Sequence, residues 1–343
     1  MSFGVLGCGH IGKRHAASVN GHSHSHVTHL IDTRAADVCG VLDLVEDGAV
    51  WSDTLEEFLL LPNLPEVVSV CTPNGLHAEQ AISLLEAGCH VVLEKPISLS
   101  VKDAKRVEAA SKATGQHVFC VMQNRFAPPS AWLKDLVDSG VLGEIRQVHI
   151  QCFWNRDDGY YEKGGWRGTL DLDGGPLFTQ FSHFIDVMYW IFGGINSPQS
   201  RFFNQAHSHN TEFEDSGQIT FNFTRSGWGS FTFSTALDRS NFESSLTLIA
   251  EKGTIRIAGQ YMQTVVHCDV QDYEMKDLPS SAPPNDYGSY KGSASNHHHV
   301  IANVVDVLRN DGSVATPLSE GVDVVEIIEA MHNSGIRPTN QAS

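Results

Sequence analysis

The first 122 residues alternate short apolar runs with amphipathic segments. The apolar runs lie at 3–9, 27–32, 66–73 and 90–96, and each ends in Gly, Asp or Pro. Between the runs at 66–73 and 90–96, residues 77–88 carry an apolar stripe that stops at Gly88. After the last run, residues 100–115 begin at a serine and end at a glycine, as a capped helix does. Strands that alternate with helices of this length predict a parallel, doubly wound α/β sheet.

A different pattern follows residue 122. Residues 144–154 alternate apolar and polar positions, residues 174–194 read as an apolar helix between glycine pairs, and β-rich runs occur at 217–225, 229–236, 244–251 and 253–259. This pattern predicts a mostly antiparallel open sheet with one buried face, with helices near 298–309 and 318–334 and an irregular loop over 269–296. We therefore predict two domains, residues 1–122 and an α+β domain over 123–343 whose C-terminal helix could pack back on the first.

Composition narrows the classes of partner. The 343 residues include 23 Lys and Arg against 40 Asp and Glu, a net charge of −17, which disfavours nucleic acid and anionic membrane surfaces as partners. The seven cysteines form no C-x-x-C pair, and no apolar run is long enough to span a bilayer. These features predict a reduced, cytoplasmic protein. Histidine clusters at 22–26, 207–209 and 297–299 lack ligand spacing, so we predict no metal site.

The segment "GCGHIG" at 7–12 is a G-x-G-x-x-G motif directly after a strand and at the start of a helix. In this context the motif predicts dinucleotide binding in a Rossmann domain, with pyrophosphate at the helix N-terminus. The predicted cofactor contacts here are Gly7, Gly9, His10, Ile11 and Gly12. Asp32 ends the second strand, where a carboxylate accepts ribose hydroxyls and repels a 2′-phosphate, which favours NAD over NADP, although Arg34 leaves some tolerance for NADP. The alternative is a glycine turn followed by a surface aspartate.

Two further strand ends carry polar residues. "CTPN" at 71–74 predicts that Thr72, Pro73 and Asn74 lie along the cofactor at the carboxyl edge of the sheet. "EKP" at 94–96 brings Lys95 to the same edge, where an ammonium group can stabilise the alkoxide that develops as hydride leaves a substrate hydroxyl. The alternatives are an ordinary turn for the first segment and a lysine paired with Glu94 for the second.

The ordered set "GCGHIG", "CTPNGLH", "EKP", "QNRF" and "GGPLFTQFSHFIDVMYWIFG" resembles the Gfo/Idh/MocA oxidoreductases over essentially the whole chain. The resemblance implies an N-terminal NAD(P)-binding Rossmann domain, a C-terminal domain that forms the substrate wall, and a homo-oligomer, dimer or tetramer, through the C-terminal sheet. It implies that Lys95 and His183 are the catalytic pair. It also extends the cofactor contacts to His77, Glu94, Lys95 and Gln123.

One departure from the family pattern affects the expected substrate. Many members carry Asp three residues before the active-site histidine, whereas this chain has Gln180, and Ser182 stands where Gly is usual. With "FWNRDDGYY", "WRG" and "QFSH", the chain is similar to a branch of the family, the UDP-N-acetylglucosaminuronate 3-dehydrogenases. The resemblance implies oxidation of a sugar 3-hydroxyl to a ketone, on a nucleotide-linked sugar used in surface-polysaccharide synthesis.

Polar and aromatic residues near these motifs are candidates for the substrate site. Arginines suit a uronate carboxylate or a diphosphate, tyrosines suit stacking on a sugar, and a glutamine supplies a neutral hydrogen bond. The predicted substrate contacts are Lys95, Asn124, Arg125, Arg156, Tyr160, Tyr161, Arg167, Gln180, Ser182 and His183. Loop packing and surface ion pairs are the alternative for the residues outside the catalytic pair.

The predicted reaction has His183 as general base, Lys95 as the group that stabilises the alkoxide, and NAD⁺ as hydride acceptor. The two side chains could exchange these roles, since either can hold or release a proton near neutrality when its pKa is shifted. Two rival functions stay open: an NAD-dependent dehydrogenase of a free sugar or a cyclitol such as inositol, and a catalytically silent NAD-sensing regulator. Whether a 2-oxo acid reoxidises NADH in place is also open.

Overall fold

The structure, a computed structural model, describes residues 1–343 except 46–47, 289 and 338–343. The described residues divide into two units. Unit 1 contains Met1–Met122 and Asn296–Val325, and unit 2 contains Gln123–Ser295 and the residues from Glu326 onward. The segment expected as one domain, 123–343, therefore contributes Asn296–Val325 to unit 1.

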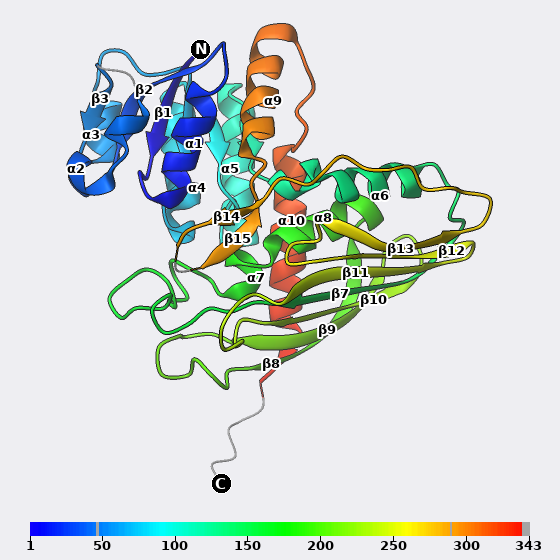
Figure 1. Ribbon diagram of the computed structural model, residues 1–343. Helices are drawn as coiled ribbons and strands as arrows, with labels where there is room; N and C mark the ends of the chain where they lie inside the picture. Colours follow the sequence, from blue (N-terminus) through cyan, green and yellow to red (C-terminus); the bar gives the residue numbers. More distant parts are fainter. Residues whose placement is uncertain (46–47, 289, 338–343) are drawn as a thin grey trace. The chain divides into compact units, whose positions relative to one another are not determined.

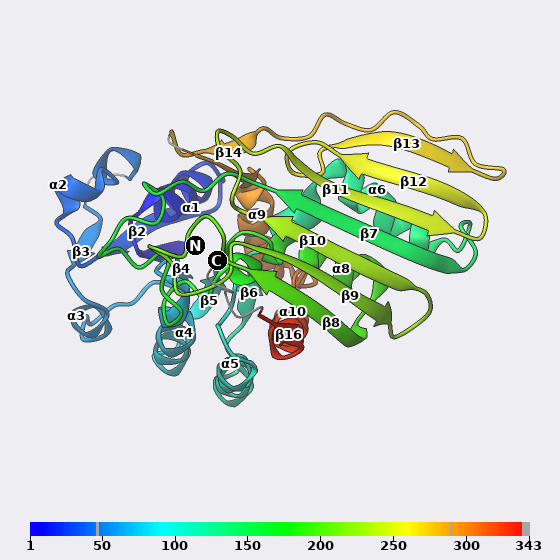
Figure 2. The ribbon, with the colours of Figure 1, turned by 90° about the horizontal axis from the view of Figure 1, so that it is seen from below.

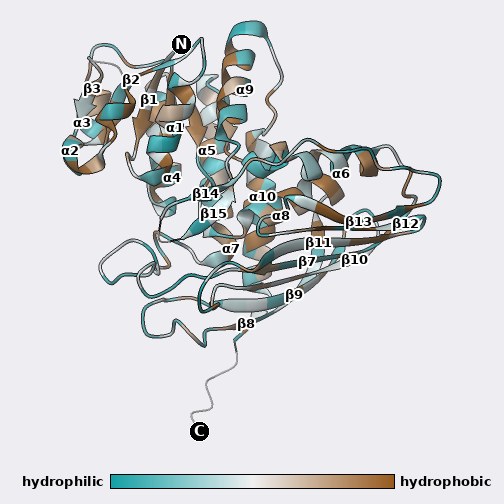
Figure 3. Cartoon of the chain, viewed as in Figure 1, coloured by the Kyte–Doolittle hydropathy of each residue, from teal (hydrophilic) through white to brown (hydrophobic). Residues whose placement is uncertain are grey.

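Unit 1 contains a six-stranded parallel sheet, as the alternation of strands and helices predicted. Its strands are β1 (Ser2–Leu6), β2 (His26–Ile31), β3 (Val50–Ser52), β4 (Val67–Val70), β5 (His90–Leu93) and β6 (Val118–Cys120). All four residues of β4 and three of the four in β5 are buried, which explains their nearly unbroken apolar runs. The neighbouring strand β1 is coloured largely brown, as hydrophobic, in Figure 3. The order β3-β2-β1-β4-β5-β6 reverses between β1 and β4, and such a reversal is where doubly wound sheets bind ligands. Figure 1 labels β1, β2 and β3 of this sheet, and Figure 2 labels β4, β5 and β6.

Helices and short 3₁₀ turns connect these strands. They are α1 (His10–Asn20), α2 (Ala36–Cys39), η1 (Leu42–Leu44), α3 (Leu55–Leu59), η2 (Asn74–Leu76), α4 (His77–Glu86), α5 (Val101–Thr114) and α9 (His297–Asn310). The Ser100 hydroxyl caps α5 by accepting the Asp103 amide, and Gly115 ends the helix in the left-handed conformation. The helix α9 packs against α1 and buries one stripe of side chains, Val300, Ile301, Val304 and Val305, together with His297.

Unit 2 contains an eight-stranded sheet in the order β13-β12-β11-β7-β10-β9-β8-β16 (Figure 2). Its strands are β7 (Ile145–Phe153), β8 (Ile195–Phe203), β9 (Ser216–Phe223), β10 (Trp228–Ser234), β11 (Glu243–Ala250), β12 (Gly253–Ala258), β13 (Thr264–Val270) and β16 (Gly335–Ile336). Only the pairs β7–β10 and β8–β16 are parallel among the described strands of this sheet, so the prediction of a mostly antiparallel sheet is confirmed. The predicted irregular loop contains a short hairpin of β14 (Pro284–Asp286) and β15 (Lys291–Ala294).

The helical segments of unit 2 are η3 (Gln123–Phe126), α6 (Pro128–Asp138), α7 (Pro176–Thr179) and α8 (Ser182–Phe192). The prediction of one helix over 174–194 is wrong, because the amides of Gln180 and Phe181 both donate to the Pro176 carbonyl and the chain turns there. In α8 only Tyr189 and Trp190 are not fully buried. The helix α10 (Leu318–Asn333) has residues in both units. Within the described chain, no helix has the length and hydrophobicity needed to cross a membrane.

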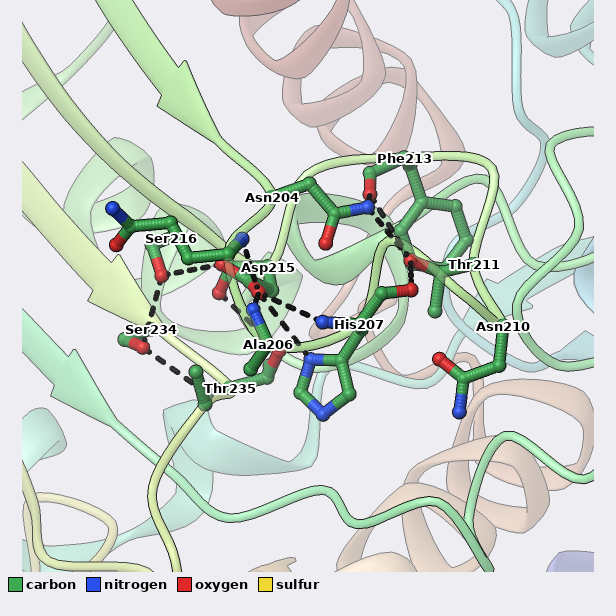
Figure 4. Close-up of polar contacts among 12 residues, drawn as sticks. Asn204, Ala206, His207, Asn210, Thr211, Phe213, Asp215, Ser216, Ser234 and Thr235 are labelled. Carbon is green, nitrogen blue, oxygen red and sulfur yellow. Dashed lines mark hydrogen bonds and ion pairs between the residues drawn. The ribbon is translucent and has the colours of Figure 1, made fainter. Parts of the chain in front are cut away.

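The loop between β8 and β9 is fastened to the start of β9 by one carboxylate (Figure 4). Oδ2 of Asp215 accepts the backbone amides of Gln205, Ala206 and His207 at 2.9, 2.7 and 3.3 Å, and Oδ1 accepts the Ser216 hydroxyl at 2.7 Å. Burial by itself would raise the pKa of Asp215, but the donors from His207, Ser216 and the loop amides outweigh it and lower the pKa to about 2. The carboxylate is therefore ionised and holds the loop in place.

We expect Asp215→Asn to destabilise unit 2 at neutral pH. A shift of about two pKa units corresponds to about 2–3 kcal/mol of stability. Because the folded pKa is depressed, this stability is present above the unfolded value of about 3.9 and is lost as the pH falls through about 2. Urea unfolding at pH 7 should show a loss of about this size, and the variant should lose less stability than the wild type between pH 5 and pH 3.

Asp158→Asn is the matched control. Its carboxylate also contacts this loop, through His209 at 3.0 Å and Asn210 at 3.0 Å, but its side chain is 73% exposed. Exposed pairs contribute little, so the control should stay within about 0.5 kcal/mol of the wild type. Equal stability of the two variants at pH 7 would contradict the anchoring role of Asp215.

Candidate active site

The glycine motif forms a tight turn from β1 into α1 that only glycine permits at two positions. Gly7 has φ +90°, and a Cβ atom there would lie 2.8 Å from the Cys71 carbonyl group. A Cβ atom on Gly12 would lie 1.9 Å from the Gly7 carbonyl oxygen. Gly9 is the N-cap of α1, and His10 and Ile11 are its first two residues. The turn thus presents a helix N-terminus to solvent, the arrangement that binds phosphate groups.

Asp32 follows β2 and reaches back to this turn. Its Oδ2 accepts the Cys8 amide at 2.7 Å and an Arg34 guanidinium nitrogen at 2.8 Å, while Oδ1 accepts the Arg34 amide at 2.9 Å. Burial opposes ionisation of this carboxyl group, but the bonds from Arg34 and Cys8 prevail and lower the pKa of Asp32. An ionised carboxylate therefore lies beside the phosphate turn.

The "CTPN" turn after β4 packs beside the phosphate turn, since the Cβ position of Gly7 abuts Cys71 and Thr72. Asn74 is buried at the start of η2. The ring of His77, 1% exposed, lies with Nδ1 2.7 Å from the Pro96 carbonyl and Nε2 2.9 Å from the Thr72 carbonyl. His77 thus connects the turns after β4 and β5.

Glu94 and Lys95 follow β5. The Glu94 carboxylate is 5% exposed and faces His15 and His297, with Oε1 2.9 Å from His15 Nε2 and 3.5 Å from His297 Nε2. Glu94 was predicted to contact the cofactor, but its carboxylate is hydrogen-bonded to His15 and to the Lys95 amide within unit 1. The Lys95 side chain is partly exposed. The sequence contained no spacing signal for His15 or for the pairing of His297 across about 200 residues.

Gln123, Asn124 and Arg125 form the buried turn η3 at the start of unit 2. The Asn124 side-chain oxygen accepts the Ser293 hydroxyl at 2.8 Å. The Arg125 guanidinium donates to both carboxylate oxygens of Asp186 on α8, at distances from 2.5 to 3.1 Å. Both side chains of this ion pair are at most 3% exposed, and the predicted contact of Arg125 with substrate stays a prediction.

The break between α7 and α8 holds three of the predicted residues. Gln180 ends α7, and Ser182 and His183 are the first residues of α8; all three are at most 5% exposed. The Gln180 amide nitrogen donates to the Tyr160 hydroxyl at 3.0 Å, while its oxygen meets no donor among the described residues. A neutral side chain therefore occupies the position where the resemblance led us to look for aspartate.

Two guanidinium groups lie among aromatic rings next to Gln180. Arg156, 3% exposed, lies 5.0 Å from the ring centres of Trp154, Tyr160 and Tyr290, and Arg167 lies 4.4 Å from that of Tyr160. The acceptors of Arg156 are two backbone carbonyls and the Asn241 amide oxygen, and that of Arg167 is the Tyr290 hydroxyl.

Throughout the described residues, no carboxylate lies within 4.0 Å of either guanidinium, and the Nε atoms of both are buried without an acceptor. We call Arg156, Arg167, Tyr160 and Tyr290 the guanidinium cluster. Asp173 raises the pKa of Arg167 electrostatically but is not within salt-bridge distance, and two positive charges without a direct carboxylate partner favour an anion as ligand. Tyr290 was not predicted, because it lies in the segment that sequence patterns assigned to an irregular loop.

Tyr161 packs against the Tyr160 ring of the guanidinium cluster. It is 1% exposed and packs edge-on against Tyr160, His207 and Phe213, with ring centres 4.9, 5.2 and 6.1 Å away. The loop fastened by Asp215 therefore contacts Tyr161 through His207. Tyr161 thus packs among aromatic rings, and its predicted contact with substrate stays a prediction.

Two alanine substitutions separate the folding and binding roles of the phosphate turn. Gly12→Ala forces a Cβ atom against the Gly7 carbonyl, so we expect unfolding stability without cofactor to fall by about 1–3 kcal/mol and NAD binding to be lost. At Gly9 a Cβ atom meets only the end of the Arg34 side chain, at 3.8 Å, and the backbone is extended. Urea unfolding and a fluorescence titration with NAD measure the two effects.

Gly9→Ala should keep its stability within about 0.5 kcal/mol, yet weaken NAD binding at least about tenfold because a methyl group obstructs the approach of pyrophosphate. An unchanged unfolding midpoint for Gly12→Ala would contradict the steric role of this glycine.

Comparison with known proteins places the chain in a family. Residues 1–121 match the "Oxidoreductase family, NAD-binding Rossmann fold" and residues 131–256 match the "GFO/IDH/MocA C-terminal domain". The chain is 29% identical to D-glucoside 3-dehydrogenase of Escherichia coli (strain K12) over 190 residues, 55% of this chain and 53% of the relative, and so spans about half of that protein.

Two solved structures are similar over almost the whole chain. The WlbA dehydrogenase from Bordetella pertussis, in complex with NADH and UDP-GlcNAcA, is 28% identical, with a TM-score of 0.85 and coverage of 97% of this chain and 95% of that one. The WlbA dehydrogenase from Chromobacterium violaceum, with the same ligands, is 27% identical, with a TM-score of 0.85 and coverage of 97% and 93%. The matches to both domains show that the chain belongs to the Gfo/Idh/MocA oxidoreductase family.

Proposed function

We propose that the protein is an NAD-dependent dehydrogenase that oxidises the 3-hydroxyl of a UDP-linked N-acetylamino sugar uronate to a ketone. The observation that carries this proposal is the guanidinium cluster, in which the buried Arg156 and the half-buried Arg167 have no carboxylate partner within salt-bridge distance among the described residues. A uronate carboxylate or a diphosphate supplies the missing negative charge, and Arg binds either with two parallel hydrogen bonds. The similarity to two WlbA dehydrogenases solved with UDP-GlcNAcA supports the same class of substrate.

Asp32 supports NAD in preference to NADP. Its carboxylate is ionised next to the phosphate turn, where it accepts ribose hydroxyls and repels a 2′-phosphate. The Arg34 guanidinium is bound to this carboxylate, which reduces its capacity to recruit an extra phosphate. The phosphate turn, Asp32 and the "CTPN" turn would together hold the dinucleotide in unit 1.

The reaction needs a base for the hydroxyl proton and a group that stabilises negative charge on the oxygen. NAD⁺ supplies the hydride acceptor when bound. We propose His183 as the base and Lys95 as the hydrogen-bond donor to the developing alkoxide, with the reverse assignment also open. The C–H bond breaks with its electron pair, the O–H proton goes to the base, and the carbon–oxygen bond becomes a carbonyl.

An uncharged glycoside or free sugar is the second candidate substrate, supported by the relative named D-glucoside 3-dehydrogenase. Such a substrate has no charge to offer the guanidinium cluster. Assays with anionic and with neutral sugars therefore distinguish the two candidate substrate classes. The homo-oligomer expected through the C-terminal sheet and the cytoplasmic location stay predictions.

We expect the wild type to oxidise UDP-N-acetylglucosaminuronate with NAD⁺, giving NADH absorbance and a product about 2 Da lighter. Arg156→Gln and Arg167→Gln should each raise KM for this substrate about 10- to 100-fold, because a charge-assisted hydrogen bond contributes about 1.5–3 kcal/mol. UDP-N-acetylglucosamine, which lacks the carboxylate, should show a higher KM that Arg167→Gln and Arg156→Gln change less.

Arg239→Gln is the matched control, since the Arg239 side chain is 92% exposed, and its KM should equal that of the wild type. Turnover of free sugars or glycosides without turnover of any anionic nucleotide sugar would favour the second candidate. No hydride transfer to NAD⁺ from any sugar, together with an NAD-dependent protein interaction, would favour the silent regulator.

Lys95→Met and His183→Asn should lower kcat by about 10² to 10⁴-fold, because each removes a group that acts only as the hydroxyl proton and hydride depart. Binding of NAD to each variant, measured by fluorescence, should stay within about threefold of the wild type. Near-normal turnover in either variant, with the fold intact by circular dichroism, would remove that residue from the catalytic pair.

A further inference from the structure

A buried group of three ionisable side chains lies behind the turn that carries Lys95. His15 comes from α1, Glu94 follows β5, and His297 is the first residue of α9, all within unit 1. They are 1%, 5% and 2% exposed. We call these three residues the His–Glu–His cluster. The proposed reaction uses none of them.

The Glu94 carboxylate is the centre of the cluster and uses both oxygens. Oε1 lies 2.9 Å from His15 Nε2 and 3.5 Å from His297 Nε2, and the two imidazole rings meet edge to face with centres 5.5 Å apart. Oε2 accepts the backbone amide of Lys95 at 3.2 Å. The carboxylate therefore connects α1 and α9 to the backbone of the residue proposed to touch substrate.

The ionisation of Glu94 follows from its burial and its hydrogen bonds. Burial by itself would raise the pKa of Glu94, yet the imidazole donors outweigh it and hold the pKa well below its ordinary value, so the carboxylate is ionised. Burial lowers the pKa of His297, which favours the neutral ring there. His15 Nε2 then donates to the ionised carboxylate, and its ring is the closer of the two.

Other charged or titratable groups face the cluster from the surrounding elements. Electrostatic interactions link Glu94 to Cys71 after β4 and to His77 on α4, and link His297 to Arg14 on α1. His77 also fixes the far side of the same turn, with Nδ1 2.7 Å from the Pro96 carbonyl. The turn that carries Lys95 is thus held on both sides by buried histidines.

The three side chains are also a donor set that could bind zinc, since their ligand atoms lie within 4.8 Å of one another. Ligands about 2.0–2.2 Å from a tetrahedral ion stand roughly 3.3–3.5 Å apart. The 2.9 Å separation of His15 and Glu94 is shorter than this and matches a hydrogen bond. The geometry therefore favours a shared proton over a metal ion.

We propose that Glu94 is a positioning residue: hydrogen-bonded to His15 and flanked by His297, its carboxylate fixes the Lys95 backbone and so the approach of the Lys95 ammonium to substrate. The proposal rests on the proposed role of Lys95 in hydride transfer. It assigns the shape of the turn to buried charge, in place of the contact between Glu94 and cofactor that the sequence led us to expect.

The first test measures the fixed backbone directly in the full-length protein. The Lys95 amide, observed with ¹⁵N-lysine and identified by the loss of its resonance in Lys95→Met, should exchange its hydrogen for deuterium at least about tenfold faster in Glu94→Gln than in the wild type. Equal exchange rates overturn the proposal, and so does one equivalent of zinc in purified protein that is lost in Glu94→Gln. This measurement needs no substrate, so it stays valid if the wild type oxidises none of the sugars tested.

The second test measures how the loss of the Glu94 charge affects turnover and cofactor binding. Glu94→Gln should lower kcat about 10- to 100-fold while KM for NAD⁺ stays within about threefold, because displacement of a reacting group affects turnover more than cofactor binding. Glu79→Gln, an exposed glutamate of the same unit that pairs with Arg106, is the matched control and should keep the wild-type kcat. His297→Asn, which retains a donor, should have a smaller effect than Glu94→Gln. An unchanged kcat in Glu94→Gln overturns the proposal.

Discussion

The cost of burying charge constrains this fold more than any single contact. An ion removed from water requires several kcal/mol of compensation from opposite charge or hydrogen bonds. Asp215 receives three backbone amides and a hydroxyl, and Glu94 faces two imidazoles. Arg125 is bound to Asp186. Each of these buried charges is compensated within its own unit and stabilises the local structure. The guanidinium cluster differs, because its acceptors among the described residues are neutral and no carboxylate lies within salt-bridge distance.

The aromatic rings do not compensate the positive charge of the guanidinium cluster. A cation–π contact contributes about 0.5–2 kcal/mol, and Arg156 and Arg167 share Tyr160 and Tyr290 between them. The desolvation of two guanidinium groups exceeds what two shared rings supply. The rings instead fix the planes of the guanidinium groups, which lowers the entropy cost of binding an anion with two parallel hydrogen bonds. The cluster is therefore preorganised for an anion, and its stability depends on the loop that Asp215 fastens.

Sequence patterns predicted the strands and the phosphate turn, because their signals lie in short stretches of the chain. The nearly continuous apolar runs of β4 and β5 and the alternation along β9 follow from the two ways a sheet buries its faces, and the phosphate turn follows from glycine sterics. Contacts between distant residues could not be read in this way. Arg125 meets Asp186 61 positions later, and the segment "INSPQSRFF" forms β8 although a proline interrupts it, because β9 pairs along it. The same holds for the helix break at Gln180, where the Pro176 carbonyl takes two amides.

Gln180 connects the break in the helix to the charge of the site. Its amide donates to the Tyr160 hydroxyl, and the Tyr160 ring lies 5.0 Å from Arg156 and 4.4 Å from Arg167. An aspartate at this position would bring a negative charge next to the ring that both guanidinium groups face, and the cluster would then hold its own counter-ion. A neutral amide supports the tyrosine without neutralising the cations. The exchange of aspartate for glutamine therefore leaves the positive charge of the guanidinium cluster to be balanced by a ligand.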